Sequence, residues 1–214
     1  MFRRRSRSEP VEPEELDDHI EDDEADIDDG PVQGPWDADD LADDGIDRVD
    51  LGSLRVAPTE DTELRLQVDE QTGAVQSAML AGEEGAIELR AFAAPRGGDL
   101  WSEVRPQIAA DVSQHGGTAT ERAGRWGVEL VCQMSVVLPD GTSAMQPSRI
   151  IGVNGPRWLL RATFLGSPAV QPDDAQLWED ALAAVVVRRG SHAMPVGDPL
   201  PLVLPDDAHR VEQP

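Results

Sequence analysis

Few residues in this sequence have the types and spacing that catalysis requires. The Gly-x-Ser-x-Gly turn that presents the nucleophile of an α/β-hydrolase does not occur. The single cysteine, Cys132, falls on the expected buried face of a strand, which favours a small core residue and a poor nucleophile. His115 stands at an expected helix end, where it complements the helix dipole, and the other histidines lie in the terminal segments. We therefore predict no catalytic residues, and the sequence favours a non-enzymatic protein.

The sequence also matches no known motif for binding a cofactor or a metal. Gly97 and Gly98 precede a helix but lack the rest of any phosphate-binding loop, so we interpret them as a strand-to-helix connection. Aligning a calcium-binding loop on Gly30 or on Gly45 puts apolar residues at ligand positions. One cysteine excludes a disulfide or a thiolate metal cluster within a single chain. We predict no cofactor-binding residues, no metal-binding residues and no cofactor.

The chain has five tryptophans and no tyrosine. Four of them lie on predicted apolar faces, where core packing explains them, and a shared aromatic pocket is the alternative; they are Trp101, Trp126, Trp158 and Trp178. Trp36 instead stands in an acidic stretch. It either docks into a partner's groove, docks onto this domain's own surface, or lies unattached at the domain's edge.

Charge is distributed unevenly along the 214 residues, whose formal net charge is −24. Residues 9–50 contain twenty acids and one arginine, and little apolar surface, so we predict a disordered acidic tail over residues 1–47. From residue 51 onward the excess of acids is modest, and the arginines are scattered singly. Nucleic acid is therefore an unlikely partner. If the tail docks onto its own domain, the arginines to examine are Arg90, Arg149, Arg157 and Arg161.

No apolar run is long enough for an export signal or a membrane span, so the sequence predicts no membrane association. The lone cysteine fits a reducing cytoplasm, and we expect a cytoplasmic protein. The oligomeric state is not predicted.

Hydrophobic periodicity predicts one α+β domain over residues 48–190. Alternating apolar residues predict strands at 64–68, 75–80, 87–91, 126–136 and 158–164. A further strand, between the last two, is expected to end at Val153. Pro147 restricts its part of a strand to an edge or a bulge. Asp99 is the expected N-cap of a helix that runs to about His115, and a second helix is expected to start at Pro172.

This order of elements predicts an antiparallel β-sheet with two main helices packed on it. A last short strand is expected within residues 185–189, followed by an extended, proline-rich C-terminal arm over residues 191–214. Residues 200–204 of that arm are apolar enough to pack back onto the domain.

Several short motifs carry a resemblance to a known family. They are the arginine-rich start, the acidic tail with its Pro-Trp-Asp segment, Asp-Leu-Gly-Ser-Leu-Arg at residues 50–55, Arg-Trp-Gly at 125–127 and Gly-Pro-Arg-Trp at 155–158. Together they resemble an actinobacterial domain family of unknown function, and the resemblance implies a cytoplasmic protein without assigning an activity. The element order also resembles the PsbP-like fold, which hosts binding and assembly proteins of several kinds.

Two functional hypotheses remain after these exclusions. The first is a non-enzymatic protein-interaction module, with an unknown protein partner and an acidic tail that regulates or solubilises it. The alternative is a small-ligand-binding protein or enzyme whose pocket is assembled from separate strands and is not recognisable in the sequence.

Overall fold

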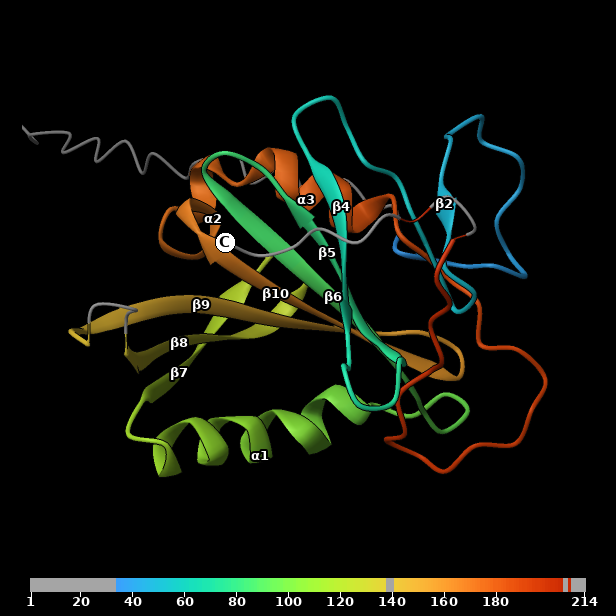
Figure 1. The fold of residues 1–214 in the computed structure, drawn as a ribbon. Coiled ribbons are helices and arrows are strands. Elements are labelled where there is room, and N and C mark those ends of the chain that lie inside the picture. Colours follow the sequence, from blue (N-terminus) through green and yellow to red (C-terminus); the bar gives the residue numbers. More distant parts are fainter. Residues whose placement is uncertain (1–33, 138–140, 206–207, 209–214) are drawn as a thin grey trace, which may run out of the picture. The chain divides into compact units, whose positions relative to one another are not determined.

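The computed structural model describes residues 34–137, 141–205 and 208 (Figure 1). They form two β-sheets and three α-helices. The larger sheet has seven antiparallel strands in the order β4-β5-β6-β10-β9-β8-β7. Their bounds are Glu63–Val68 (β4), Val75–Ala81 (β5), Gly85–Ala93 (β6), Trp158–Gly166 (β10), Ser143–Asn154 (β9), Gly127–Val137 (β8) and Thr118–Gly124 (β7).

The smaller sheet is made of short strands in the order β1-β11-β3-β2. These are Trp36–Asp37 (β1), Val186–Val187 (β11), Leu54–Val56 (β3) and Val49–Asp50 (β2). The β1 and β11 strands are parallel, and the other pairs are antiparallel. The helices are Leu100–Gln114 (α1), Ser167–Val170 (α2) and Gln176–Ala183 (α3), with a 3₁₀ turn at Pro172–Asp174.

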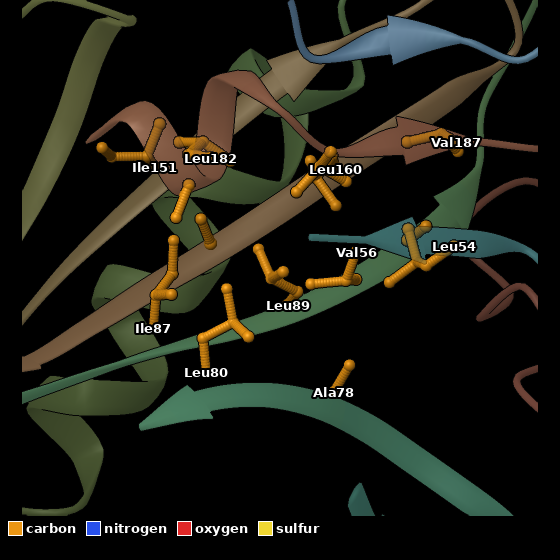
Figure 2. Close-up of a cluster of buried hydrophobic side chains, with 14 of the residues drawn as sticks. Leu54, Val56, Ala78, Leu80, Ile87, Leu89, Ile151, Leu160, Leu182 and Val187 are labelled. Carbon is orange, nitrogen blue, oxygen red and sulfur yellow. The ribbon is translucent and has the colours of Figure 1, made fainter. Parts of the chain in front are cut away.

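The seven-stranded sheet is covered on both faces. One face packs against the smaller sheet and α3 in a cluster that includes Leu54, Leu89 and Leu182, several members of which Figure 2 shows converging between the strands. On the other face, side chains from α1 form a second cluster with Leu130 and Leu159, and Figure 1 shows α1 lying along that side. Because strand side chains alternate between faces, successive residues of β6 and β10 point alternately toward the first and the second cluster.

Most predicted strands are present, and the α1 boundaries agree with the prediction. Asp99 is the N-cap and His115 is the C-cap. Pro147 pairs only with Gln133 on β8, because pairing with β10 stops at Ser148, so it occupies an edge as predicted. Leu200 is buried and Leu202 packs on the core, so part of the C-terminal arm folds back onto the domain.

The structure differs from the sequence predictions in several elements. Strand β7 was missed, since Thr118–Gly124 has no apolar alternation and is held by pairing with β8. The second helix was expected from Pro172, but the 3₁₀ turn occupies that position, α3 begins at Gln176, and the short helix α2 precedes both.

The structure also begins before the predicted boundary at residue 48. Trp36 donates its backbone N–H to the carbonyl of Val185, and Asp37 accepts the indole N–H of Trp158 at 2.7 Å. The acidic segment therefore gains structure from partners far along the chain rather than from its own apolar content. Residues 1–33 of the predicted tail lie outside the described residues.

Candidate functional site: a pocket between helix α1 and the sheet

Helix α1 is held against the sheet by its first turn. The Asp99 carboxylate accepts hydrogen bonds from the backbone N–H and the hydroxyl of Ser102, and the amide of Asn154 donates to it from the end of β9. The indole N–H of Trp101 donates to the Val128 carbonyl at 2.6 Å, and its ring lies over Gly152. These contacts fix where the apolar face of α1 meets strands β6 and β10.

A pocket of about 340 Å³ lies between that face and the two strands; we call it the α1 pocket. Its apolar wall is formed by Phe92, Leu100, Val104, Ile108 and Leu159. Gly197 of the C-terminal arm also lines it, where the arm pairs with the end of β6. The volume falls within the range typical of small-ligand pockets, roughly 300 to 1,000 Å³, and the mainly apolar lining is also typical.

The polar groups of the α1 pocket are few. Arg161 projects from β10, while Gln107 and Asp111 are exposed residues of α1, one helical turn apart. Asp111 lies 3.5 Å from the His115 ring, so its carboxylate is turned at least partly toward the helix end. The pocket thus combines an apolar wall, one half-buried cation and a polar rim.

A second arginine stands directly beside Arg161. Arg90 of β6 is its cross-strand partner in the antiparallel register, and both guanidinium groups lie near the ring of Phe92, with their Cζ atoms 5.8 Å and 5.3 Å from its centroid. We call Arg90 and Arg161 the arginine pair. Within the described part of the chain, neither side chain has a hydrogen-bond acceptor or an ion-pair partner, and the Nε of Arg90 is buried without one.

The electrostatics of Arg161 reflect this environment. Burial lowers the pKa of its guanidinium, the neighbouring charge of Arg90 lowers it further, and Glu88 opposes the shift. Arginine nevertheless remains protonated in proteins. The arginine pair therefore places two positive charges side by side, which destabilises a sheet unless an anion lies between or beside them.

The other arginines named from the sequence have different surroundings. Arg157 donates to the carbonyl of Gly190 at 3.3 Å. Arg149 is buried on the opposite face of the sheet, where it contacts Glu129 and Glu179 and stacks 4.2 Å from the centroid of Phe164. The four arginines therefore form no single patch, and only Arg90 and Arg161 are brought together.

The tryptophans do not form a shared aromatic pocket. Trp158, Trp178 and Trp126 belong to the cluster under the smaller sheet, whereas Trp101 belongs to the cluster under α1. The indole N–H groups of Trp101, Trp126 and Trp158 donate to Val128, Glu179 and Asp37, respectively. Core packing, the simpler of the two interpretations, is the one the geometry supports.

Cys132 lies on a buried strand face, as predicted. Cys132 is fully buried in the α1 cluster, and burial raises the pKa of its thiol, as a poor nucleophile requires. Among the described residues no group of three or more potential metal ligands occurs, and no helix is long and apolar enough to cross a membrane.

Trp36 lines a second hollow of about 540 Å³ between residues 36–46 and the end of α3. Four aspartates also line it: Asp40, Asp43, Asp44 and Asp180. Arg48 compensates one of them, since its hydrogen bond holds the pKa of Asp44 at about 2. Of the three possibilities for Trp36, docking onto the domain itself is the one observed.

Replacing Asp99 with alanine should lower the free energy of unfolding by about 1 kcal/mol, because it removes the N-cap of α1. Hydrogen bonds from Ser102 depress the pKa of Asp99 below its ordinary value of 3.8. A depressed folded-state pKa means that the contribution is present above the unfolded pKa and lost as pH falls through the folded one. Urea unfolding of the unmodified protein and the Asp99→Ala variant should therefore show a difference in the free energy of unfolding at neutral pH, and this difference should shrink below about pH 4. A difference that persists unchanged in acid would contradict this ionised cap.

The described residues therefore form a mainly β structure with three helices, in which Arg161 lines the α1 pocket and Arg90 lies beside it on the neighbouring strand. The chain belongs to the family described as "Protein of unknown function (DUF3710)", which matches residues 34–211. A comparison with curated proteins gives no match. The family description assigns no activity, so a function must be argued from the geometry.

Two solved structures show partial similarity. A crystal structure from Bacteroides thetaiotaomicron VPI-5482 is 12% identical over 67% of this chain and 48% of that chain, with a TM-score of 0.37. The solution structure of cyanobacterial PsbP (CyanoP) from Synechocystis sp. PCC 6803 is 11% identical over 66% of this chain and 91% of that chain, with a TM-score of 0.35. The chain spans about half the length of the Bacteroides protein.

Proposed function

We propose that this domain is a binding protein for a small anionic ligand with an apolar portion, held in the α1 pocket. The observation that carries the proposal is the arginine pair, which has no acceptor among the described residues and lies at an apolar pocket of ligand size. Charge-assisted hydrogen bonds to arginine are among the stronger polar contacts, and apolar burial supplies the rest of the affinity.

The nature of the lining groups supports binding rather than catalysis. Arg161, Gln107 and Asp111 are its polar side chains, and the buried thiol of Cys132 is not among the residues that line it. Of the two sequence hypotheses, this geometry supports the small-ligand alternative over the protein-interaction module. The expected actinobacterial, cytoplasmic setting and a solubilising role for the acidic tail remain parts of the proposal, and the free thiol of Cys132 is consistent with a reducing compartment.

Replacing Arg161 with methionine should weaken ligand binding about tenfold to hundredfold, since a hydrogen bond to a charged group contributes roughly 1.5 to 3 kcal/mol. The measurement is isothermal titration of the full chain with single-tailed alkyl carboxylates, phosphates and sulfonates. The matched control is Arg65→Met, which removes the same charge from an exposed arginine paired with Glu63 on β4.

Thermal unfolding of both variants separates loss of binding from loss of fold. Binding that is intact in Arg65→Met and lost in a folded Arg161→Met protein supports the proposal. If no amphipathic anion binds the unmodified protein, or if Arg161→Met binds as tightly as the control, the proposal is wrong.

A further inference from the structure

The arginine pair provides more charge and more donors than a single carboxylate uses. Each guanidinium presents five N–H donors in a planar fork, and one fork satisfies both oxygens of a carboxylate. Arg90 and Arg161 are direct cross-strand partners, whose Cβ atoms are typically about 5 Å apart in an antiparallel sheet. Both forks therefore originate on the same side of the sheet and within reach of one head group.

Phe92 positions the two forks relative to the apolar wall. Its ring contacts both guanidinium groups and also lines the α1 pocket. A ligand whose tail lies against Phe92, Leu159 and Ile108 would therefore have its head group beside Arg161, with Arg90 next to it. A tetrahedral head group with three terminal oxygens matches two forks that approach from neighbouring strands, whereas a planar one with two oxygens leaves the second fork unused.

Other charged groups also lie near the arginine pair. Glu88 of β6 lies close enough to affect Arg161 electrostatically, and Asp111 with His115 stands at the rim on α1. Neither Glu88 nor Asp111 forms a hydrogen bond or an ion pair with Arg90 or Arg161. Two adjacent cations with no bonded anion are matched by a ligand that carries two negative charges.

From this geometry we propose that the ligand is a phosphate monoester with an apolar tail, its dianionic phosphate held by Arg90 and Arg161 and its tail in the α1 pocket. This inference rests on the proposed function and specifies its ligand class. The same chemistry occurs in a soluble phosphorylated metabolite and in a lipid with a phosphomonoester head group, and the experiment distinguishes these two sources.

The test compares octyl phosphate, octyl sulfate and octanoate by isothermal titration of the full chain. The phosphate and the sulfate have the same shape but different charge, and the carboxylate is planar. We expect the phosphate to bind about tenfold tighter than either monoanion at about pH 7.5, and Arg90→Met to abolish this preference while Arg161→Met weakens all three ligands.

A change of pH provides an independent readout. The second pKa of a phosphate monoester is about 6, so lowering the pH from about 7.5 to about 5.5 should weaken octyl phosphate about fourfold as the dianion disappears. A carboxylate, with a pKa of about 4.3, remains mostly ionised over this range. Octanoate therefore reports any effect of pH on the protein itself and corrects for it.

Vesicles of a zwitterionic phospholipid, with and without phosphatidate, provide the lipid arm. Arg161-dependent sedimentation with the phosphatidate vesicles assigns the head group to a lipid, and binding of soluble octyl phosphate alone assigns it to a soluble metabolite; either result supports the inference. Arg90→Gln is the second variant if Arg90→Met does not fold. If octanoate binds as tightly as octyl phosphate and still requires Arg161, the inference is wrong while the proposed function stands. If none of the three binds, both are wrong.

Discussion

Replacing Arg149 with methionine should lower the free energy of unfolding by about 3 to 5 kcal/mol, because it leaves two buried carboxylates without their shared cation. The Arg149 side chain is 3% exposed and lies between Glu129 and Glu179, with nitrogen-to-oxygen distances of 3.5 Å and 2.5 Å. Both glutamates are buried as well. Methionine has a similar length and packs against Phe164, so the substitution leaves little cavity. The loss of stability should therefore be mainly electrostatic.

Arg122 provides the graded comparison for this prediction. It donates to the same Glu129 carboxylate, but its own side chain is 41% exposed, so water partly replaces it when it is removed. Arg122→Met should therefore cost clearly less than Arg149→Met, and the exposed Arg65→Met should cost almost nothing. The measurement is urea unfolding followed by tryptophan fluorescence.

A double variant tests the cause directly. Glu129 keeps Arg122 as a partner, whereas Glu179 loses its cation, so converting Glu179 to glutamine in the Arg149→Met protein removes the uncompensated charge and part of the lost stability should return. If Arg149→Met is no more destabilising than Arg65→Met, the buried ion network does not contribute as described. If the double variant is as unstable as the sum of the single ones, the loss is not electrostatic.

Local sequence signals predicted the elements that are stabilised locally. In strands β4, β6 and β10 apolar residues of the larger cluster recur at every second position, and that pattern is visible without knowing any partner. Helix α1 was bounded correctly by Asp99 and His115 because an N-cap acts on the residues that follow it directly.

The elements that were missed depend on distant partners. The two residues of β1 are held by hydrogen bonds to Val185 and Val187, and Thr118–Gly124 is a strand only because β8 lies beside it. The composition of an acidic or weakly apolar segment does not predict which distant strand it pairs with. Trp36 and Asp37, within the predicted tail, therefore pair with β11 although their own acidic surroundings give no sign of it.

The candidate site could be predicted only in part for the same reason. Arg90 and Arg161 were identified as residues to examine, but their pairing depends on the register between β6 and β10, which no local pattern reveals. The α1 pocket likewise requires Val104 and Ile108 to face β10 at a distance set by Trp101. One available signal was that Arg90 and Arg161 each follow an apolar core residue in strict alternation, which places both on the second face of the sheet.

Gly152 controls that distance, and replacing it with alanine should destabilise the fold by about 3 kcal/mol. A Cβ at this position would overlap the indole ring of Trp101, which is 4% exposed and fixed by its hydrogen bond to Val128. The ring cannot move aside without lifting the first turn of α1. Since moving that turn would displace Leu100 and the Val104 that follows it, Gly152→Ala should also weaken the proposed ligand binding in the α1 pocket.

The partner residue provides the decisive comparison. Trp101→Ala alone should cost about 3 to 5 kcal/mol, because it opens a cavity between α1 and the sheet. In the double variant the new Cβ of residue 152 enters space that the ring has vacated. In a double-mutant cycle, the double variant should therefore lose clearly less stability than the sum of the two single losses. Strict additivity would mean that Gly152 is not needed for the close approach of Trp101. A strong coupling would instead show that one glycine sets the distance between α1 and the sheet, and with it the depth of the α1 pocket.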